Sequence, residues 1–230
     1  CYKSFEIFLR QFIFTLQACA ICTIFKIKIL LIIYMKFYDE NNNIIDHMKI
    51  ERVEQKHAEM FLAKNDVVLE LGARYGTVSC VINKKVSNQV SVEPDQRVWN
   101  SLENNMKNNN CNFNIIKGFV SEKKLELIFD DNDDYATTSK INNESTIPSF
   151  TLNEIQKKFN INKFNVLIID AEGFMEQFID ENLDILKDLR LIMFEADQPH
   201  KCDYNKIEKI LLENNFRPKI KGFHNVYFKL

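Results

Sequence analysis

The sequence predicts an α/β fold: a three-layer, doubly wound, mostly parallel sheet of seven strands that ends in a C-terminal antiparallel hairpin. Short apolar segments alternate with amphipathic ones along residues 44–230, which is typical of strands joined by right-handed crossover helices. Two apolar segments, 67–71 and 164–170, lead into turns that contain glycine. The final segments, 219–221 and 226–230, are short and close together in the chain, as in a hairpin.

The length of the chain indicates a single domain, and its charge bears on which partners it binds. The chain has 230 residues and a formal net charge of −2 at pH 7, which allows a sizeable core but gives no basic field for non-specific nucleic-acid binding. We therefore predict no nucleic-acid partner. The six cysteines are scattered rather than arranged as a framework, so a reducing compartment, the cytoplasm, is the simpler expectation.

Residues 1–43 are predicted to be an apolar N-terminal extension and linker, followed by one domain over 44–230. Only 15 residues separate Arg10 from Lys26, fewer than the roughly 20 that a membrane-spanning helix needs. Because composition changes at Met35, residues 1–34 are interpreted as sequence from upstream of the native start. Membrane association through residues 1–35 and a cleaved signal peptide are the alternatives.

The first half of the domain contains three predicted strands, 67–71, 89–93 and 113–117, with a helix after each of the first two. Proline stops a strand and is accepted in the first turn of a helix, so Pro94 is expected to end the second strand and begin the next helix. That helix is expected to direct Val98, Leu102 and Met106 inward.

The strand–helix rhythm breaks between 122 and 148. Residues 125–129 are predicted to form an additional strand, and 130–139 an exposed, mobile connection. Such a connection is either a functional loop or a solvated acidic turn. The remaining predicted elements are a helix from the capping box Thr151-x-x-Glu154 to Phe159, a strand at 164–170, a helix after Gly173 with Met175, Phe178, Ile179 and Leu183 inward, a strand at 189–195, and a helix around Ile207, Ile210 and Leu211.

The turn after the first strand carries the first chemical signal. Its pattern Glu70-x-Gly72-x-x-x-Gly76 places a strand-end acid beside glycines, whose backbone N–H groups can approach a ligand closely. The spacing differs from the dinucleotide fingerprint. It suits a ligand with a ribose and a charged amino-acid tail.

Four segments together resemble class I S-adenosylmethionine-dependent methyltransferases, and among them the FkbM-like family. They are Glu70–Gly76, the strand end Val92-Glu93-Pro94, the helix start at Thr151, and Asp170-x-Glu172-Gly173 followed by a strand ending at Glu195. The resemblance covers about residues 50 to 230. It implies a Rossmann-like methyltransferase fold and S-adenosylmethionine as cofactor.

The resemblance also implies roles for particular residues. Glu93 would accept both ribose hydroxyls, and the glycine loop would lie against the amino-acid portion. Glu70 would orient that loop or meet the ammonium group through water, or simply cap the loop's N–H groups. The expected cofactor-binding residues are Glu70, Gly72, Ala73, Gly76, Glu93, Pro94, Gly118, Phe119, Val120 and Asp170.

Asp170, Glu172 and Glu195 are the expected catalytic acids, because a general base must take the proton of the acceptor hydroxyl. The resemblance implies that the acceptor is a hydroxyl oxygen, that of a sugar on a glycan or of a small metabolite. Ribose 2′-O-methylation of RNA and a non-catalytic cofactor-binding scaffold are the alternatives. No residue spacing demands a metal ion, and none is predicted.

Two positions depart from the family pattern. Relatives usually carry Lys two residues before the strand-end Asp and Glu two residues after the glycine, whereas this chain has Ile168 and Met175 there. If those residues handle the substrate, acceptor specificity has changed or activity is reduced.

Overall fold

The structure is a computed structural model that describes residues 35–130 and 133–230. Phe37–Leu230 form one compact unit. Within it β1 (Phe37–Tyr38) pairs with β2 (Ile44–Ile45), so the unit includes residues before the expected boundary near 44. The anchor and signal-peptide alternatives fall on residues 1–34, outside the described part of the chain. No helix among the described residues has the length and apolarity needed to cross a membrane.

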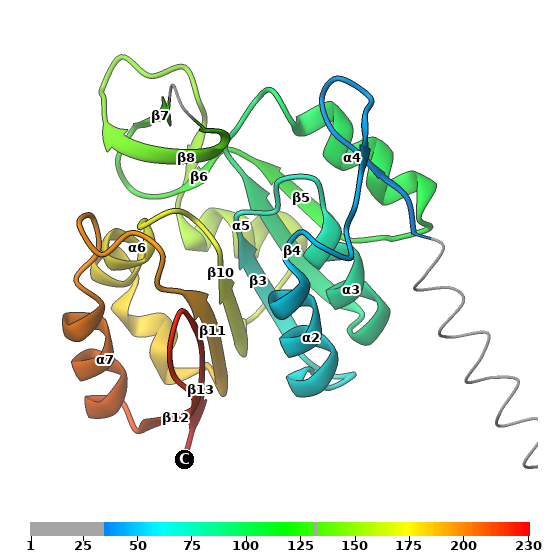
Figure 1. Cartoon of the computed structure of the whole chain (residues 1–230). Helices are drawn as coiled ribbons and strands as arrows, with labels where there is room; N and C mark the ends of the chain where they lie inside the picture. The colour runs from blue at the N-terminus through cyan, green and yellow to red at the C-terminus, as the bar shows by residue number, and fades with distance from the viewer. Residues whose placement is uncertain (1–34, 131–132) are drawn as a thin grey trace, which may run out of the picture. The chain divides into compact units, whose positions relative to one another are not determined.

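A seven-stranded sheet forms the middle of the compact unit (Figure 1). Its order is β12-β13-β11-β10-β3-β4-β5, parallel from β11 to β5, with β13 antiparallel to β11 and β12 antiparallel to β13. The predicted doubly wound sheet and terminal hairpin are confirmed. The strands are β3 (Val67–Leu71), β4 (Asn88–Glu93), β5 (Asn114–Lys117), β10 (Val166–Ile169), β11 (Leu191–Glu195), β12 (Phe216–Ile220) and β13 (His224–Lys229).

Helices cover both faces of the sheet (Figure 1). One face packs against α5, α6 and α7 through an apolar cluster that includes Leu69, Leu167, Ile155, Phe178 and Leu211. The other face is covered by α2 and α3, which pack against each other. The helices are α2 (Arg52–Phe61), α3 (Thr77–Lys85), α4 (Trp99–Asn108), α5 (Leu152–Phe159), α6 (Met175–Glu181) and α7 (Tyr204–Glu213).

The two-residue alternation of the strands decides which helical layer each acid faces. In β3, Leu69 and Leu71 belong to the cluster on the α5–α7 face. Glu70 between them therefore points to the opposite face, where its carboxylate contacts Ser79 of α3. By the same alternation, Glu195 of β11 lies on the α2 face.

Helix α4 begins later than predicted. Pro94 ends β4 as expected, but Asp95 accepts hydrogen bonds from the backbone N–H and the guanidinium of Arg97, which holds the intervening residues in a turn. The helix starts at Trp99. Val98 and Leu102 are buried as predicted, whereas Met106 is only partly buried.

The segment predicted as an irregular connection is a strand. β7 (Leu125–Asp130) confirms the additional strand, but residues 133–141 form β8 (Asp133–Ile141), antiparallel to β7. Thr137 and Thr138 pair with Phe129 and Ile128, and β-branched threonine favours extended backbone. The acidic composition of this segment had concealed its strand propensity. A short parallel pair, β6 (Phe119–Val120) and β9 (Ser149–Phe150), flanks this hairpin in the chain.

Other predictions on the same half of the chain have mixed outcomes. The capping box of α5 is present, with Thr151 and Glu154 each bonded to the other's backbone N–H. Leu183, expected to be inward, is half exposed and begins the 3₁₀ helix η1 (Leu183–Lys187), because α6 already ends at Glu181.

Two of the scattered cysteines form a disulfide. Cys80 in α3 and Cys111 after α4 are bonded, with their Cα atoms 5.6 Å apart. The expectation that the cysteines are reduced is therefore wrong for this pair. Sequence spacing did not reveal it because the two residues meet only where α3 contacts the loop between α4 and β5, at which Asn83 also bonds to Asn112. Cys202 is free and buried.

Candidate active site

The cavity that brings together most of the predicted site residues, called the main cavity below, lies at the carboxyl ends of β3, β4 and β10, which is where ligands bind in open α/β sheets. Of the residues expected to bind the cofactor, the structure brings together Gly72, Glu93, Pro94, Gly118, Phe119, Val120 and Asp170 around this cavity. Glu70, Ala73 and Gly76 do not line it.

The loop after β3 is held against the neighbouring strand. The N–H groups of Gly72 and Ala73 both donate to the carbonyl oxygen of Val92, at 3.0 Å. Gly76 has φ +81 and begins α3, and a Cβ there would lie 2.9 Å from a methyl group of Leu102. Ala73 and Gly76 therefore hold the loop in position through contacts with β4 and α4, whereas Gly72 lines the cavity itself.

Glu93 is buried at the floor of the cavity. Its Oε2 accepts a hydrogen bond from the backbone N–H of Arg74 at 2.6 Å, and its Oε1 one from the N–H of Asp95 at 2.7 Å. Burial raises the pKa of Glu93 to about 7, although these two hydrogen bonds favour the ionised form. Each oxygen keeps a further lone pair, so the carboxylate can accept two more hydrogen bonds from a ligand.

Glu70 lies outside the lining of the main cavity. Its Oε2 accepts hydrogen bonds from the hydroxyls of Ser79 and Ser91 and, at 3.3 Å, from the amide of Gln89. Burial raises the pKa of Glu70 to about 7, against the lowering effect of these bonds. Glu70 therefore links β3 to β4 and α3 on the face of the sheet that α2 and α3 cover.

Asp170 follows β10 and lines the main cavity. Its backbone N–H donates to the carbonyl of Leu71 at 3.0 Å, which joins the ends of β10 and β3. Burial, followed by the negative charges of Glu51, Glu54, Glu172 and Asp197, raises the pKa of Asp170 well above its usual value. A carboxylate in such surroundings is a stronger proton acceptor than an exposed aspartate.

The two other expected catalytic acids, Glu172 and Glu195, line different cavities. Glu172 lines the main cavity, has φ +45, and accepts a hydrogen bond from the amide of Gln198 at 2.8 Å. Glu195 does not line the main cavity but a second one on the α2 face, together with Glu54 and His224. Asp170 borders both cavities.

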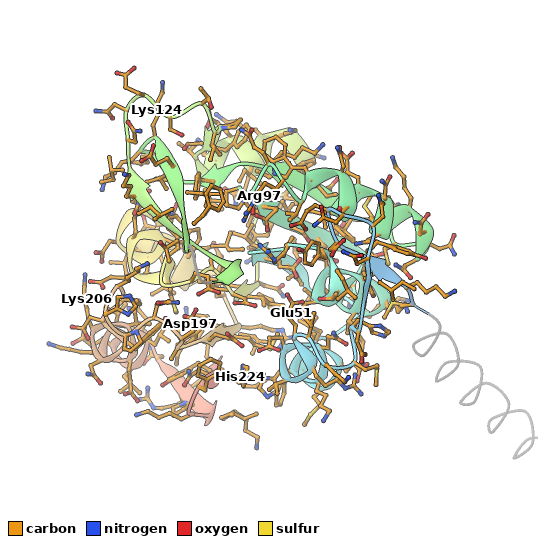
Figure 2. All side chains as sticks on the ribbon, turned by 45° about the horizontal axis from the view of Figure 1, so that its top comes forward. Glu51, Arg97, Lys124, Asp197, Lys206 and His224 are labelled. Carbon is orange, nitrogen blue, oxygen red and sulfur yellow. A yellow bond between two sulfur atoms is a disulfide. The ribbon has the colours of Figure 1, made fainter. Side chains whose placement is uncertain are left out.

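Sequence reasoning missed several residues of the main cavity. Glu51, just before α2, and Arg74, in the glycine loop, both line it. Figure 2 shows Glu51 and Asp197 on either side of the middle of the molecule, with His224 below them. The charge of Arg74 within the glycine pattern was a usable signal, whereas nothing near Glu51 marks it as a site residue.

The β7–β8 hairpin also contributes to the main cavity, through Leu127, Thr138 and Ser139. Arg97 joins the hairpin to the β4 loop, since its guanidinium lies 4.0 Å from the ring centre of Phe129 and bonds to Asp95 at 2.8 Å. The break in rhythm had left a functional loop and a solvated acidic turn as alternatives for this segment, and a function of the hairpin stays a prediction.

Comparison with solved structures shows the class of fold. The chain is similar to precorrin-6y C5,15-methyltransferase from Geobacter metallireducens GS-15, with TM-score 0.51 and 14% identity over 80% of this chain and 91% of that one. It is also similar to a protein of the NADB-Rossmann superfamily from Streptococcus agalactiae, with TM-score 0.50 and 9% identity over 76% and 67%. The fold is that of the class I, Rossmann-like methyltransferases.

The family follows from the sequence of the domain. Residues 70–218 match the family model described as the methyltransferase FkbM domain, and this range is more than half of the chain. The chain belongs to the FkbM methyltransferase family, as its motifs had suggested, and membership implies S-adenosylmethionine as methyl donor. A search of curated proteins finds no match.

Proposed function

We propose that this methyltransferase transfers the methyl group of S-adenosylmethionine to a hydroxyl oxygen, and that the acceptor is a sugar hydroxyl on a glycan or a small metabolite. One observation carries the proposal: Glu93 and Asp170 line the same cavity from β4 and from the end of β10, on either side of β3. Glu93 is suited to accept hydrogen bonds from a ribose, and Asp170 is suited to accept a proton from the acceptor.

The chemistry of the cavity lining fits the donor. The free lone pairs of Glu93 suit the two ribose hydroxyls, and the apolar surfaces of Phe119 and Val120 suit adenine. Gly72 presents backbone without a side chain where the amino-acid portion would lie. The carboxylate of Glu51 lies on the same cavity and is assigned to the ammonium group.

Asp170 is assigned as the general base. S-adenosylmethionine supplies a methyl carbon activated by positive sulfur, so the new oxygen–carbon bond forms as the carbon–sulfur bond breaks and sulfur keeps the electron pair. The acceptor proton goes to a carboxylate oxygen of Asp170, whose raised pKa suits it to this transfer. Glu172 is assigned to orient the acceptor hydroxyl.

Charge supports a neutral acceptor over RNA. Among the residues that the structure describes, the ionisable ones on the main cavity are four acids, Glu51, Glu93, Asp170 and Glu172, and one base, Arg74. A phosphate backbone is bound by clusters of lysine and arginine, which this lining does not supply. A sugar hydroxyl carries no charge and can donate to these carboxylates.

Calorimetric titration with S-adenosylmethionine, followed by methyl-transfer assays on saccharides, small polyols and short RNAs, tests the proposal. We expect saturable donor binding and transfer to a saccharide or polyol. In Asp170→Asn, kcat should fall by about 10²–10⁴-fold while the dissociation constant of the donor changes less than about threefold.

The matched control is Asp184→Asn, whose side chain is 90% exposed in η1, and it should keep full activity. Failure to bind the donor would exclude the proposal. Transfer to RNA alone would overturn the acceptor class, and binding without transfer to any acceptor would indicate a scaffold. An unchanged kcat in Asp170→Asn would remove this residue from the mechanism.

A further inference from the structure

A second cluster of ionisable groups lies on the α2 face of the sheet, apart from the main cavity. Glu195 in β11 and His224 in β13 are direct partners across an antiparallel pair, so their side chains emerge on the same face. Glu54 reaches them from α2. His224 Nδ1 lies 2.6 Å from Glu54 Oε1 and 3.0 Å from Glu195 Oε1.

These three side chains are largely buried, yet their hydrogen bonding is incomplete. The side chain of Glu54 is only 10% exposed, that of Glu195 18% and that of His224 25%. Glu54 Oε1 and His224 Nδ1 are inaccessible to solvent, and neither makes a hydrogen bond of acceptable geometry. The two atoms contact each other at 2.6 Å, but buried polar atoms without hydrogen bonds are costly, so a ligand that bonds to both would stabilise them.

The cavity beside these atoms is acidic and small. Among the described residues, its lining includes Glu54, Glu70, Asp170 and Glu195 but no lysine or arginine. The bases beside these carboxylates are two histidines, His57 and His224, and several carboxylates so close together repel one another and are costly to ionise. The cavity volume is about 20 Å³, and one water-sized particle requires about 10–15 Å³.

We propose that Glu54, Glu195 and His224 bind a divalent metal ion. One oxygen from each carboxylate and Nδ1 of the histidine all lie within 4.8 Å of one another, so one ion can contact all three. Two carboxylates and one imidazole suit Mn²⁺, Fe²⁺ or Zn²⁺. Two positive charges would offset the two carboxylates, and the ion would give Glu54 Oε1 and His224 Nδ1, which make no hydrogen bond, a common partner.

The proposed ion would lie next to the main cavity. Three protein ligands leave coordination positions open, and Asp170 and Gly72 border both cavities. The ion is therefore near enough to influence the acceptor side of the site. The binding of the metal does not depend on the proposed methyl transfer, and its test requires neither donor nor acceptor.

Manganese is the probe that tests this site most cleanly. Thiolates select Zn²⁺, and the sequence carries Cys19 and Cys22, whereas Mn²⁺ favours oxygen and imidazole ligands. Full-length protein freed of metal by a chelator would be titrated with Mn²⁺ and followed by electron paramagnetic resonance. We expect one bound ion per chain, with nitrogen hyperfine coupling from His224.

The substitutions Glu54→Gln and Glu195→Gln should each weaken Mn²⁺ binding by at least about tenfold, since the loss of a residue that merely supports a metal ligand already costs about 10–100-fold in affinity. His224→Gln should remove the nitrogen coupling. Glu59→Gln on the same helix is the matched control and should leave the affinity unchanged within about twofold.

Circular dichroism of each variant would establish that it is folded. Absence of a stoichiometric Mn²⁺ site in the wild type would overturn the proposal. So would a site of unchanged affinity in folded Glu54→Gln and Glu195→Gln, or a nitrogen coupling that persists in His224→Gln.

Discussion

The backbone of Gly72 lies directly against the backbone of Asp170. A Cβ atom added to Gly72 would lie 1.7 Å from the carbonyl oxygen of Asp170, and Gly72 has φ +91. The close approach is possible because β3 and β10 are paired up to Leu71 and Ile169. The two ends of these strands therefore form one wall of the main cavity, with the glycine on one side and the acid on the other.

Gly72→Ala should disrupt this wall. The new methyl group must displace backbone, and the positive φ is unfavourable for alanine, so we expect a loss of about 2–4 kcal/mol in the free energy of unfolding. Affinity for S-adenosylmethionine should fall by about tenfold or more, as a displaced loop no longer fits the donor. Gly222→Ala is the matched control, because a Cβ there meets nothing within 4 Å. Equal stability of the two variants, measured by urea unfolding, would contradict the close approach.

Donor affinity should depend on pH through Glu93. Burial raises the pKa of Glu93 from 4.5 to about 7, and the ionised form is the one that accepts hydrogen bonds from both ribose hydroxyls. Affinity should therefore be constant above about pH 7 and fall by up to about tenfold per pH unit below it.

Calorimetric titrations from pH 5.5 to 8.5 measure this dependence. Glu93→Gln should bind the donor more weakly at pH 8 and show a flatter pH profile, since glutamine does not titrate. Glu213→Gln, whose side chain is 63% exposed, should keep the wild-type profile. A wild-type affinity that rises as the pH falls would show the opposite sign and exclude this role.

Glu70 should make stability fall with rising pH. Burial raises its pKa from 4.5 to about 7, so between these values the folded state holds a proton that the unfolded state has released. The free energy of unfolding should then decrease across that window, by about 2–4 kcal/mol from this residue, and level off above about pH 7.

Urea unfolding of wild type and Glu70→Gln at pH 4.5, 5.5, 7 and 8 isolates this contribution. Glutamine retains an acceptor for Ser79 and Ser91 but carries no charge, so the decrease should be smaller in the variant. Identical pH profiles would show that Glu70 does not titrate in this window.

The Cys80–Cys111 disulfide should stabilise the fold against unfolding. It joins residues 31 apart in the chain, and a cross-link of that span contributes about 2–4 kcal/mol by restricting the unfolded state. Reduction with dithiothreitol should lower the free energy of unfolding by that amount in the wild type and leave a Cys80→Ala/Cys111→Ala variant unchanged. Non-reducing peptide mapping should recover the linked pair. A wild type insensitive to reduction would contradict the prediction.

Most of the sheet could be predicted because its strands carry strong local signals. Val67–Leu71 and Leu191–Glu195 are apolar runs with acidic or glycine ends, and the pattern of their spacing specifies parallel pairing. The β8 strand was missed because its acidic and threonine-rich composition resembles a solvated loop. The late start of α4 was missed because the side chain of Asp95, rather than Pro94, determines where the turn ends.

The site was predictable in part for the same reason. Glu93 is the last residue of a strand, and Gly118 and Asp170 each directly follow one, so their position at one edge of the sheet follows from the order of the chain. Glu54 and His224 could not be found in this way. They come from a helix before the first parallel strand and from the last hairpin. Glu54 meets Glu195 only through the packing of α2 on the sheet, and His224 meets it only through the pairing of β13 with β11.

The sequence by itself determined the doubly wound sheet, the family and the strand ends that line the main cavity, because these depend on local periodicity and on the order of elements. Only the tertiary structure decided that Glu70 and Glu195 face the α2 and α3 layer, that Cys80 meets Cys111, and that the β7–β8 hairpin borders the cavity. These relations depend on which face of a strand a residue occupies and on how distant segments pack, and a shift of one residue in register would reverse the first of them.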